Sequence, residues 1–359
     1  MLIYSVWLSK KIKKVYEYLQ ENTRYVGVQL GIGGWQPFKA SFVDEKKYGD
    51  CKALSNYTKA LLKATGINSY YTLVKAGGNE PDILYDFPSR QFNHVFLCVP
   101  LESDTVWLEC TSQTNPFGYL GSFTSDRHVL LITEDGGKLV RTPTYKTAQN
   151  KKTTVADVYI DKEGLAKVSA TINCSGLQFE NNYFYQYVNE SYDKQKKWLY
   201  QTLDISGVII DEFSLSAAGE IVPEGTMNLD LSVPKYASVN GKRMFIQPNI
   251  LSKSGYIPDK VEERNSNVYI KNSGWDSDSI VFHIPEGFHI EFKPETIDIE
   301  SEFGAYHSEI TLEENKVTLL RTFKLEAGTY PPEKYEDLRE YLRQVVKADK
   351  SKIVFVNRT

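Results

Sequence analysis

The strongest constraint on the fold is a change of sequence pattern near residue 150. Before it, apolar positions at helical spacing alternate with short β-rich runs; after it, many short β-rich segments are separated by Pro, Gly, Asn and Asp. Only stretches 192–203 and 332–348 keep helical character there, and residues 143–152 are polar without apolar periodicity. We therefore predict an α+β chain: a mixed domain over residues 1–145, then a mainly antiparallel β domain with two helices over 153–359.

Charge and hydropathy narrow the classes of partner. The net charge of −4 gives no electrostatic reason to expect nucleic-acid binding. The sequence contains no apolar run of about 18 residues, so we expect no membrane span. The apolar start of the chain is too short for a signal peptide and has no basic region before it.

The most informative stretch for function is residues 47–66, which reads as a loop, a helix cap and a helix. Asp50 is a favourable N-cap residue, Gly49 permits a tight approach, and Gly66 ends the helix. Cys51 therefore falls in the first helical turn, where the helix dipole and unpaired N–H groups favour a thiolate. The alternative interpretation is that Cys51 is a small buried apolar residue.

A cysteine nucleophile needs a base and a group that orients the base, and two predicted strands supply both. Residues 94–99 and 105–110 show the alternation of β-strands, and residues 100–103 suit a four-residue hairpin loop between them. Closing this hairpin pairs Leu97 with Val106 and His94 with Glu109. A carboxylate beside His94 can fix the imidazole tautomer and support its positive form. Taken alone, His94 could equally be a half-buried strand histidine and Glu109 a solvated charge.

These residues carry a resemblance to the bacterial transglutaminase-like family, which has a papain-type fold. The similar motifs span residues 24–117: Gly49-Asp-Cys51-Lys, Leu61-Leu-Lys-Ala-Thr-Gly-Ile67, Asn93-His94-Val and Trp107-Leu-Glu109-Cys-Thr111. The resemblance implies a catalytic set of Cys51, His94 and Glu109. The family usually has Asp-Pro-Thr where this chain has Glu109-Cys110-Thr111.

The same resemblance suggests the oxyanion donor and the wider setting. Gln29 and Gln36, or alternatively Trp35, are candidates to assist the Cys51 N–H, because papain-like enzymes place such a donor before the cysteine helix. Segments 255–258, 303–306 and 330–333 resemble the trailing domain of a multi-domain branch of the family. We therefore expect an upstream β domain to be missing from this chain, and a periplasmic or cell-envelope location.

The predicted function is thiol-dependent acyl transfer, most simply hydrolysis of a peptide or amide bond in a peptide or protein substrate. A lysine amine as acceptor would instead give a transglutaminase. The alternative is a non-catalytic scaffold that binds peptides or glycans. We expect no cofactor and no metal: there is no calcium-loop signature, and the spacing of His283, His289 and His307 fixes no metal geometry.

Overall fold

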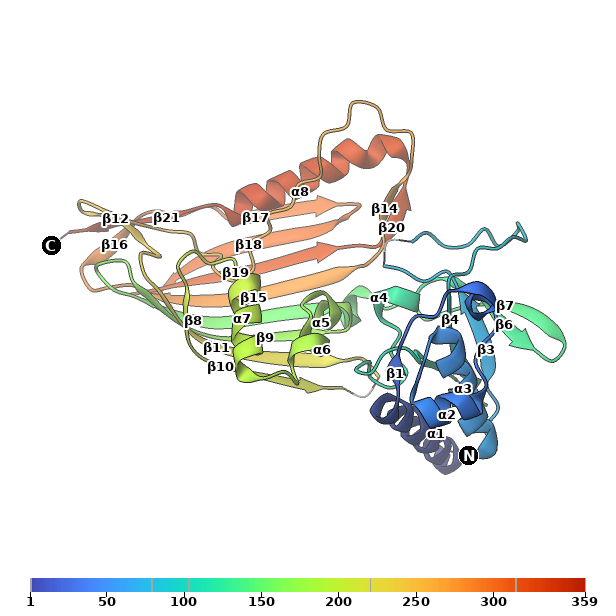
Figure 1. Cartoon of the computed structure of the whole chain (residues 1–359). Coiled ribbons are helices and arrows are strands. Elements are labelled where there is room, and N and C mark those ends of the chain that lie inside the picture. The colour runs from blue at the N-terminus through green and yellow to red at the C-terminus, as the bar shows by residue number, and fades with distance from the viewer. Residues whose placement is uncertain (1, 79, 103, 220, 314, 359) are drawn as a thin grey trace. The chain divides into compact units, whose positions relative to one another are not determined.

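The computed structural model describes residues 2–78, 80–102, 104–219, 221–313 and 315–358, which form two compact units (Figure 1). The first unit comprises Met1–Tyr145 with Gly219–Pro223, and the second comprises Lys146–Ala218 with Glu224–Thr359. Helices and several antiparallel sheets are both present, so the predicted α+β class is confirmed. None of the described helices combines the length and apolar character needed to cross a membrane.

The first unit is a five-stranded antiparallel sheet with four helices among its described residues. The sheet has the order β5-β4-β3-β6-β7, and a separate pair of short strands, β1 and β2, runs parallel. Its elements are α1 (Leu2–Asn22), β1 (Arg24–Tyr25), η1 (Gly31–Gly34), α2 (Ala40–Lys46), β2 (Tyr48–Gly49), α3 (Cys51–Ala64), β3 (Tyr70–Val74), β4 (His94–Pro100), β5 (Thr105–Leu108), α4 (Gly121–Thr124), β6 (His128–Thr133) and β7 (Gly136–Arg141).

Alternation along β4 and β5 gives this sheet two apolar faces. Leu97 and Leu108 pack with the buried sides of α1, α2 and α3, whereas Phe96, Cys98 and Trp107 belong to a second cluster. The alternation predicted for residues 94–99 and 105–110 is therefore confirmed in β4 and β5. On the first face, helical spacing of apolar residues such as Ile12, Tyr16 and Leu19 fixes which side of α1 is buried.

The predicted register of the β4–β5 hairpin is wrong by two residues. Val106 lies opposite Val99 rather than Leu97, and Leu97 pairs with Leu108. The observed register places apolar side chains against the fully buried Val99, where the predicted one would have placed an aspartate. Because a shift of two residues keeps every side chain on its own face, Glu109 remains on the His94 side, just beyond the end of β5.

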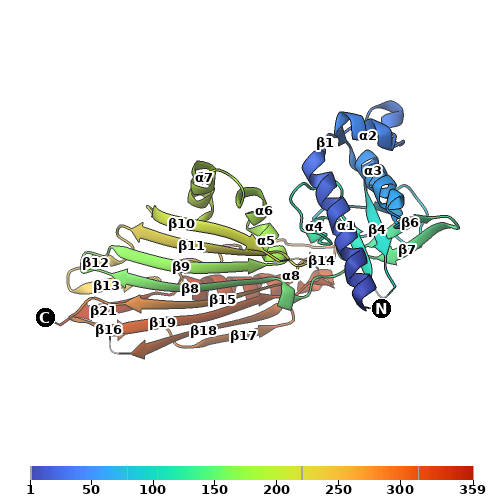
Figure 2. The ribbon, with the colours of Figure 1, turned by 90° about the horizontal axis from the view of Figure 1, so that it is seen from below.

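The second unit is built on an eight-stranded sheet of order β10-β11-β9-β8-β15-β19-β18-β17, which Figure 2 shows as neighbouring arrows. A four-stranded sheet, β12-β13-β21-β16, and the pair β14-β20 complete it. The elements are η2 (Thr147–Gln149), β8 (Lys151–Ile160), β9 (Ala166–Ser175), α5 (Leu177–Asn181), α6 (Phe184–Tyr187), α7 (Tyr192–Thr202), β10 (Ile209–Ala218), β11 (Glu224–Val233), β12 (Ser238–Asn240), β13 (Arg243–Ile246), β14 (Val268–Ile270), β15 (Gly274–His283), β16 (Phe288–Phe292), β17 (Ile297–Ser301), β18 (Gly304–Glu313), β19 (Lys316–Leu325), β20 (Gly328–Tyr330), η3 (Pro332–Lys334), α8 (Tyr335–Asp349) and β21 (Ile353–Asn357).

Helices cover one face of the large sheet. Phe184 of α6 and Trp198 of α7 pack on inward-facing residues of β8, β9 and β11, while α8 packs beside β17. The two helices predicted in this half are α7 and α8, and the short helices α5 and α6 were missed. Strand β10 was not predicted either, because its side chains are mostly exposed and show no clear apolar alternation. The sheet is antiparallel except for the parallel pair of β8 and β15.

The stretch 143–152, predicted as a polar connection, contains η2 and the first residues of β8. Of residues 24–30, only Arg24 and Tyr25 form a strand, and this strand pairs with β2.

Candidate active site

Cys51 is the first residue of α3, and the local sequence explains why the helix begins there. Asp50 is extended and caps the helix: its Oδ1 accepts a hydrogen bond from the Ala53 N–H at 2.9 Å, and its carbonyl accepts from Leu54 at 2.9 Å. The Asp50 carboxylate also forms a buried ion pair with Lys52. The predicted cap is therefore present, and Cys51 lies in the first turn with 4% of its surface exposed.

Gly49 is required for this arrangement because strand β2 runs directly into the helix. A Cβ at this position would lie 2.7 Å from the Cβ of Ala53. The parallel pairing of Tyr25 with Gly49, reinforced by a 2.9 Å bond from the Val26 N–H to the Gly49 carbonyl, places β1 beside the start of α3. Only a residue without a side chain permits both contacts.

His94 and Glu109 are in direct contact. The His94 Nε2 lies 3.0 Å from Oε1 and 3.1 Å from Oε2 of Glu109, and both residues are buried. The hydroxyl of Thr111 donates to Glu109 Oε1 at 2.6 Å, and the hydroxyl of Tyr16 donates to the Glu109 carbonyl oxygen at 3.0 Å. Thr111, two residues after Glu109, thus helps to hold the Glu109 carboxylate in place. The carboxylate in turn fixes the orientation of the His94 imidazole through Nε2.

The charges of this site favour an imidazolium. Burial alone would lower the pKa of His94, but the negative charge of Glu109 and hydrogen bonds to Cys51 and Glu109 raise it from 6.5 to about 10. Burial opposes the ionised form of Glu109 as well, yet His94 and Thr111 hold the pKa of that carboxyl below its ordinary value. Because Nε2 is engaged by Glu109, Nδ1 is the ring nitrogen left for the Cys51 thiol.

The structure therefore brings together Cys51, His94 and Glu109, although their catalytic roles remain a prediction. Burial raises the pKa of Cys98, Cys110 and Cys174 to about 12 in each case. Those three thiols are therefore held in the neutral form at physiological pH.

The oxyanion candidates Gln29, Gln36 and Trp35 lie before α2 with exposed side chains. Trp35 stacks under the guanidinium of Arg90, whose Cζ is 3.9 Å from the ring centroid. No described hydrogen bond of Gln29 or Gln36 reaches Cys51, so the structure provides no support for their assignment as oxyanion donors.

Three aromatic residues near the site were not selected from the sequence. Burial raises the pKa of Tyr25, and the charges of Cys51, Asp50 and Glu109 raise it further. Burial and the charge of Cys51 also raise the pKa of Tyr71. Phe123 of α4 packs edge-on against the His94 ring, with 5.0 Å between centroids. Aromatic residues are common in this chain, so the sequence gave no specific signal for these three.

The histidines of the second unit do not gather. His283 is on β15 and lies 2.7 Å from Asp157, whereas His307 on β18 lies 2.7 Å from Asp298. His289 belongs to a different sheet, on β16. Within the described residues, no group of three or more His, Cys, Asp and Glu side chains is arranged to hold a metal ion.

Comparisons with known proteins address the fold. Residues 242–355 match the model of a family described as a domain of unknown function with solved structure, DUF3858. The crystal structure of a candidate protease from Parabacteroides distasonis is similar to 97% of this chain with a TM-score of 0.51 and 14% sequence identity. The similarity covers 52% of that protein, so this chain corresponds to about half of its length. No curated protein matches the sequence.

Proposed function

We propose that the first unit is a papain-like, transglutaminase-like cysteine hydrolase that cleaves a peptide or amide bond. The observation that carries this proposal is the continuous chain of contacts from the capped helix start at Cys51, through His94, to the buried Glu109. The order nucleophile, base and orienting acid is the arrangement that acyl transfer by a thiol needs. The similar fold of a protein named as a candidate protease supports the same class.

In the proposed mechanism, His94 is the imidazolium that the charges of the site favour, with the proton from Cys51 already on Nδ1. The Cys51 thiolate Sγ forms a bond to the substrate carbonyl carbon, and the C=O π electrons move to the oxygen. The C–N bond then breaks, and the proton on His94 passes to the leaving amine. Water next attacks the thioester, His94 takes a proton from that water, and the C–S bond breaks to release the acid and restore the Cys51 thiolate beside the protonated His94. Glu109 keeps Nε2 protonated and stabilises the imidazolium in both half-reactions.

The oxyanion that develops during attack needs donors. The Cys51 N–H belongs to the first turn of α3, where backbone N–H groups have no partner within the helix. The Tyr25 hydroxyl is the second donor we propose, because the pairing of β1 with β2 holds this residue beside the start of the helix.

The test uses the full chain with a mixture of peptides, and new peptide termini are identified by mass spectrometry. We expect cleavage that Cys51→Ala abolishes and that Cys174→Ala, a change to a buried thiol of the second unit, leaves intact. A covalent acyl adduct on Cys51 should accumulate when turnover is slowed at low pH. Added putrescine reports whether an amine competes with water as the acceptor.

The opposite outcome favours the alternative function. Peptide binding without cleavage, together with no adduct on Cys51, would refute the hydrolase and leave the module as a peptide- or glycan-binding scaffold.

A further inference from the structure

The second unit contains a cavity of about 280 Å³ that the proposed chemistry does not use. Its floor is the helix-covered face of the eight-stranded sheet. Its roof is the end of α7, including Leu199 and Leu203, and the segment 250–254. This volume lies just below the usual range for sites of drug-sized ligands, about 300–1,000 Å³, so any occupant must be small.

The strand register places four residues of different chemical types in a row across this floor. Cys174 of β9 pairs with Lys152 of β8, which pairs with Asp276 of β15, which in turn pairs with Phe323 of β19. Paired residues share a face of the sheet, and all four line the cavity. Lys152 and Asp276 therefore occupy neighbouring strand positions on a floor that also includes Arg321, but no ion pair joins these two residues in the described part of the chain.

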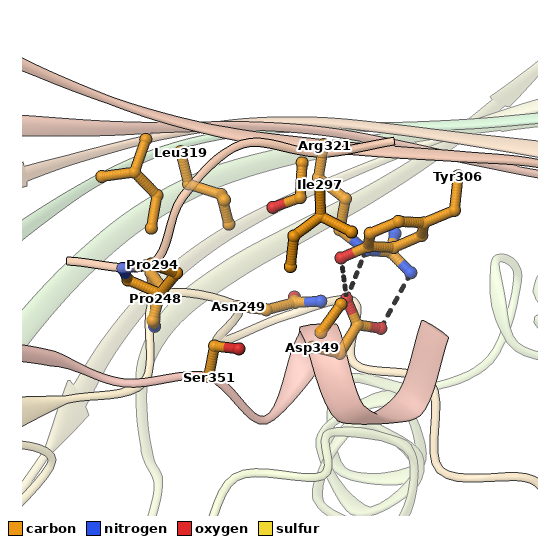
Figure 3. A pocket seen from close by; sticks show the side chains of 12 residues that line it. Pro248, Asn249, Pro294, Ile297, Tyr306, Leu319, Arg321, Asp349 and Ser351 are labelled. Carbon is orange, nitrogen blue, oxygen red and sulfur yellow. Dashed lines mark hydrogen bonds and ion pairs between the residues drawn. The ribbon is translucent and has the colours of Figure 1, made fainter. Parts of the chain in front are cut away.

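Most of the other charged groups at the cavity are already paired. Lys253 of the roof lies 3.3 Å from Asp204. Arg321 makes a two-pronged contact with Asp349 through Nε at 2.7 Å and Nη2 at 3.0 Å, and its Nη1 lies 2.8 Å from Asp278. Tyr306 also donates to Asp349, at 2.9 Å. Figure 3 draws a second pocket, whose lining shares Arg321 with this cavity, and shows Arg321, Tyr306 and Asp349 converging in this network. Arg321 reaches the cavity wall, but its donors are engaged, so it has little capacity for a ligand.

Lys152 differs from Arg321 in having no ion pair within the described part of the chain. Its positive charge acts on Asp276 and Cys174 from longer range. Asp276 is held by the Gln178 amide, 2.9 Å from Oδ1, and burial raises the pKa of its carboxyl. Lys152 is therefore a partly buried ammonium without a close anionic partner, and an anion from outside would satisfy it.

Apolar side chains make up a large part of the remaining lining, which also includes the polar residues Asn182, Thr202 and Ser252. Ile172 and Met227 extend the floor on β9 and β11, and Leu199, Leu203 and Ile250 form the wall opposite. Burying a hydrocarbon group against these side chains is favourable by about 25 cal/mol for each Å² removed from water.

From this arrangement we propose that the cavity is a binding site for a small apolar monocarboxylate. The carboxylate pairs with Lys152, and the hydrocarbon part lies between the sheet and the end of α7. This proposal is independent of the chemistry at Cys51.

The test uses hydrocinnamate as the probe and methionine methyl groups as reporters. The chain has three methionines, of which Met227 lines the cavity and Met244 is buried in the core outside the lining. With isotope-labelled methionine methyl groups, hydrocinnamate should shift the Met227 signal saturably and leave Met244 unchanged. Hydrocinnamamide, which has the same shape without the charge, should bind at least about tenfold more weakly, as expected for loss of a charge-assisted contact.

Variants at adjacent lysines separate the charge from general effects. Lys152→Met should weaken hydrocinnamate binding about tenfold or more. Lys151→Met should leave it unchanged, because Lys151 lies on the other face of β8, over the Trp275 ring. The proposal is overturned if Met227 does not respond to millimolar hydrocinnamate, if Met244 responds equally, or if the amide binds as tightly as the acid. The last comparison uses the wild-type chain and so does not depend on the folding of a variant.

Discussion

Replacement of Glu109 by glutamine isolates the interaction on which the candidate site depends. The amide has nearly the shape of the carboxylate but lacks its charge. In the wild-type protein, Glu109 offsets the burial that would otherwise lower the pKa of His94. In Glu109→Gln, burial should dominate, and His94 should be neutral at pH 7.

The size of the effect follows from linkage. The pKa of His94 is raised from 6.5 to about 10 in the folded state, so its contribution to stability is fully present below pH 6.5 and is lost as the pH rises through 10. At about 1.4 kcal/mol for each unit of pKa difference, this contribution is on the order of 4 kcal/mol at pH 7. Glu109 is the other partner of the same interaction, so its lowered pKa adds no separate contribution over this range.

Two measurements check this prediction. The ring proton of His94 should titrate above pH 9 by NMR in the wild type and below pH 6.5 in Glu109→Gln. The difference in unfolding free energy between the two proteins, from urea denaturation, should shrink steadily from pH 7 to pH 10. Glu45→Gln, which removes an exposed carboxylate, is the control and should change neither value. A wild-type His94 that titrates near 6.5 would refute the reasoning.

Three further changes test other parts of the structure. Gly49→Ala places a methyl group against Ala53 and should cost about 1–3 kcal/mol of unfolding free energy while slowing the labelling of Cys51; unchanged stability would contradict the close packing of β2 on α3. Arg321→Met leaves buried carboxylates, including Asp349, without a counter-ion and should cost about 3–5 kcal/mol by urea denaturation; a loss below 1 kcal/mol would show that the network is not energetically coupled. Tyr25→Phe should lower kcat of peptide cleavage about tenfold or more, as expected for loss of an oxyanion donor, with the alkylation rate of Cys51 unchanged; equal loss of both would point to a structural role.

The features predicted best from sequence were those fixed by local chemistry. A capping aspartate, a terminal glycine and helical spacing defined α3, and the position of Cys51 at its start followed directly. The contact of His94 with Glu109 survived an error in the hairpin register, because the error was an even number of residues. The loop gave no indication of the two-residue difference, which depends on apolar pairing across the finished sheet.

Features that depend on distant contacts were not predictable from local pattern. The strand β10 is largely exposed, so its apolar alternation is weak. The parallel pairing of β8 with β15 joins residues more than one hundred positions apart, and this pairing places Lys152 beside Asp276. The oxyanion candidates Gln29, Gln36 and Trp35 were chosen by resemblance, and their role stays a prediction, as does the periplasmic location.

The most direct test of a Cys51–His94–Glu109 unit is the alkylation rate of each cysteine as a function of pH, read by mass spectrometry in the folded protein. We predict that Cys51 reacts with iodoacetamide at neutral pH, well before Cys98, Cys110 and Cys174, whose pKa values burial raises to about 12. His94→Ala should remove most of this advantage at neutral pH and little of it at high pH, where the thiolate forms without help. If Cys51 reacts no faster than the other three thiols, or if His94→Ala leaves its rate unchanged, the claim of a coupled nucleophile and base is wrong.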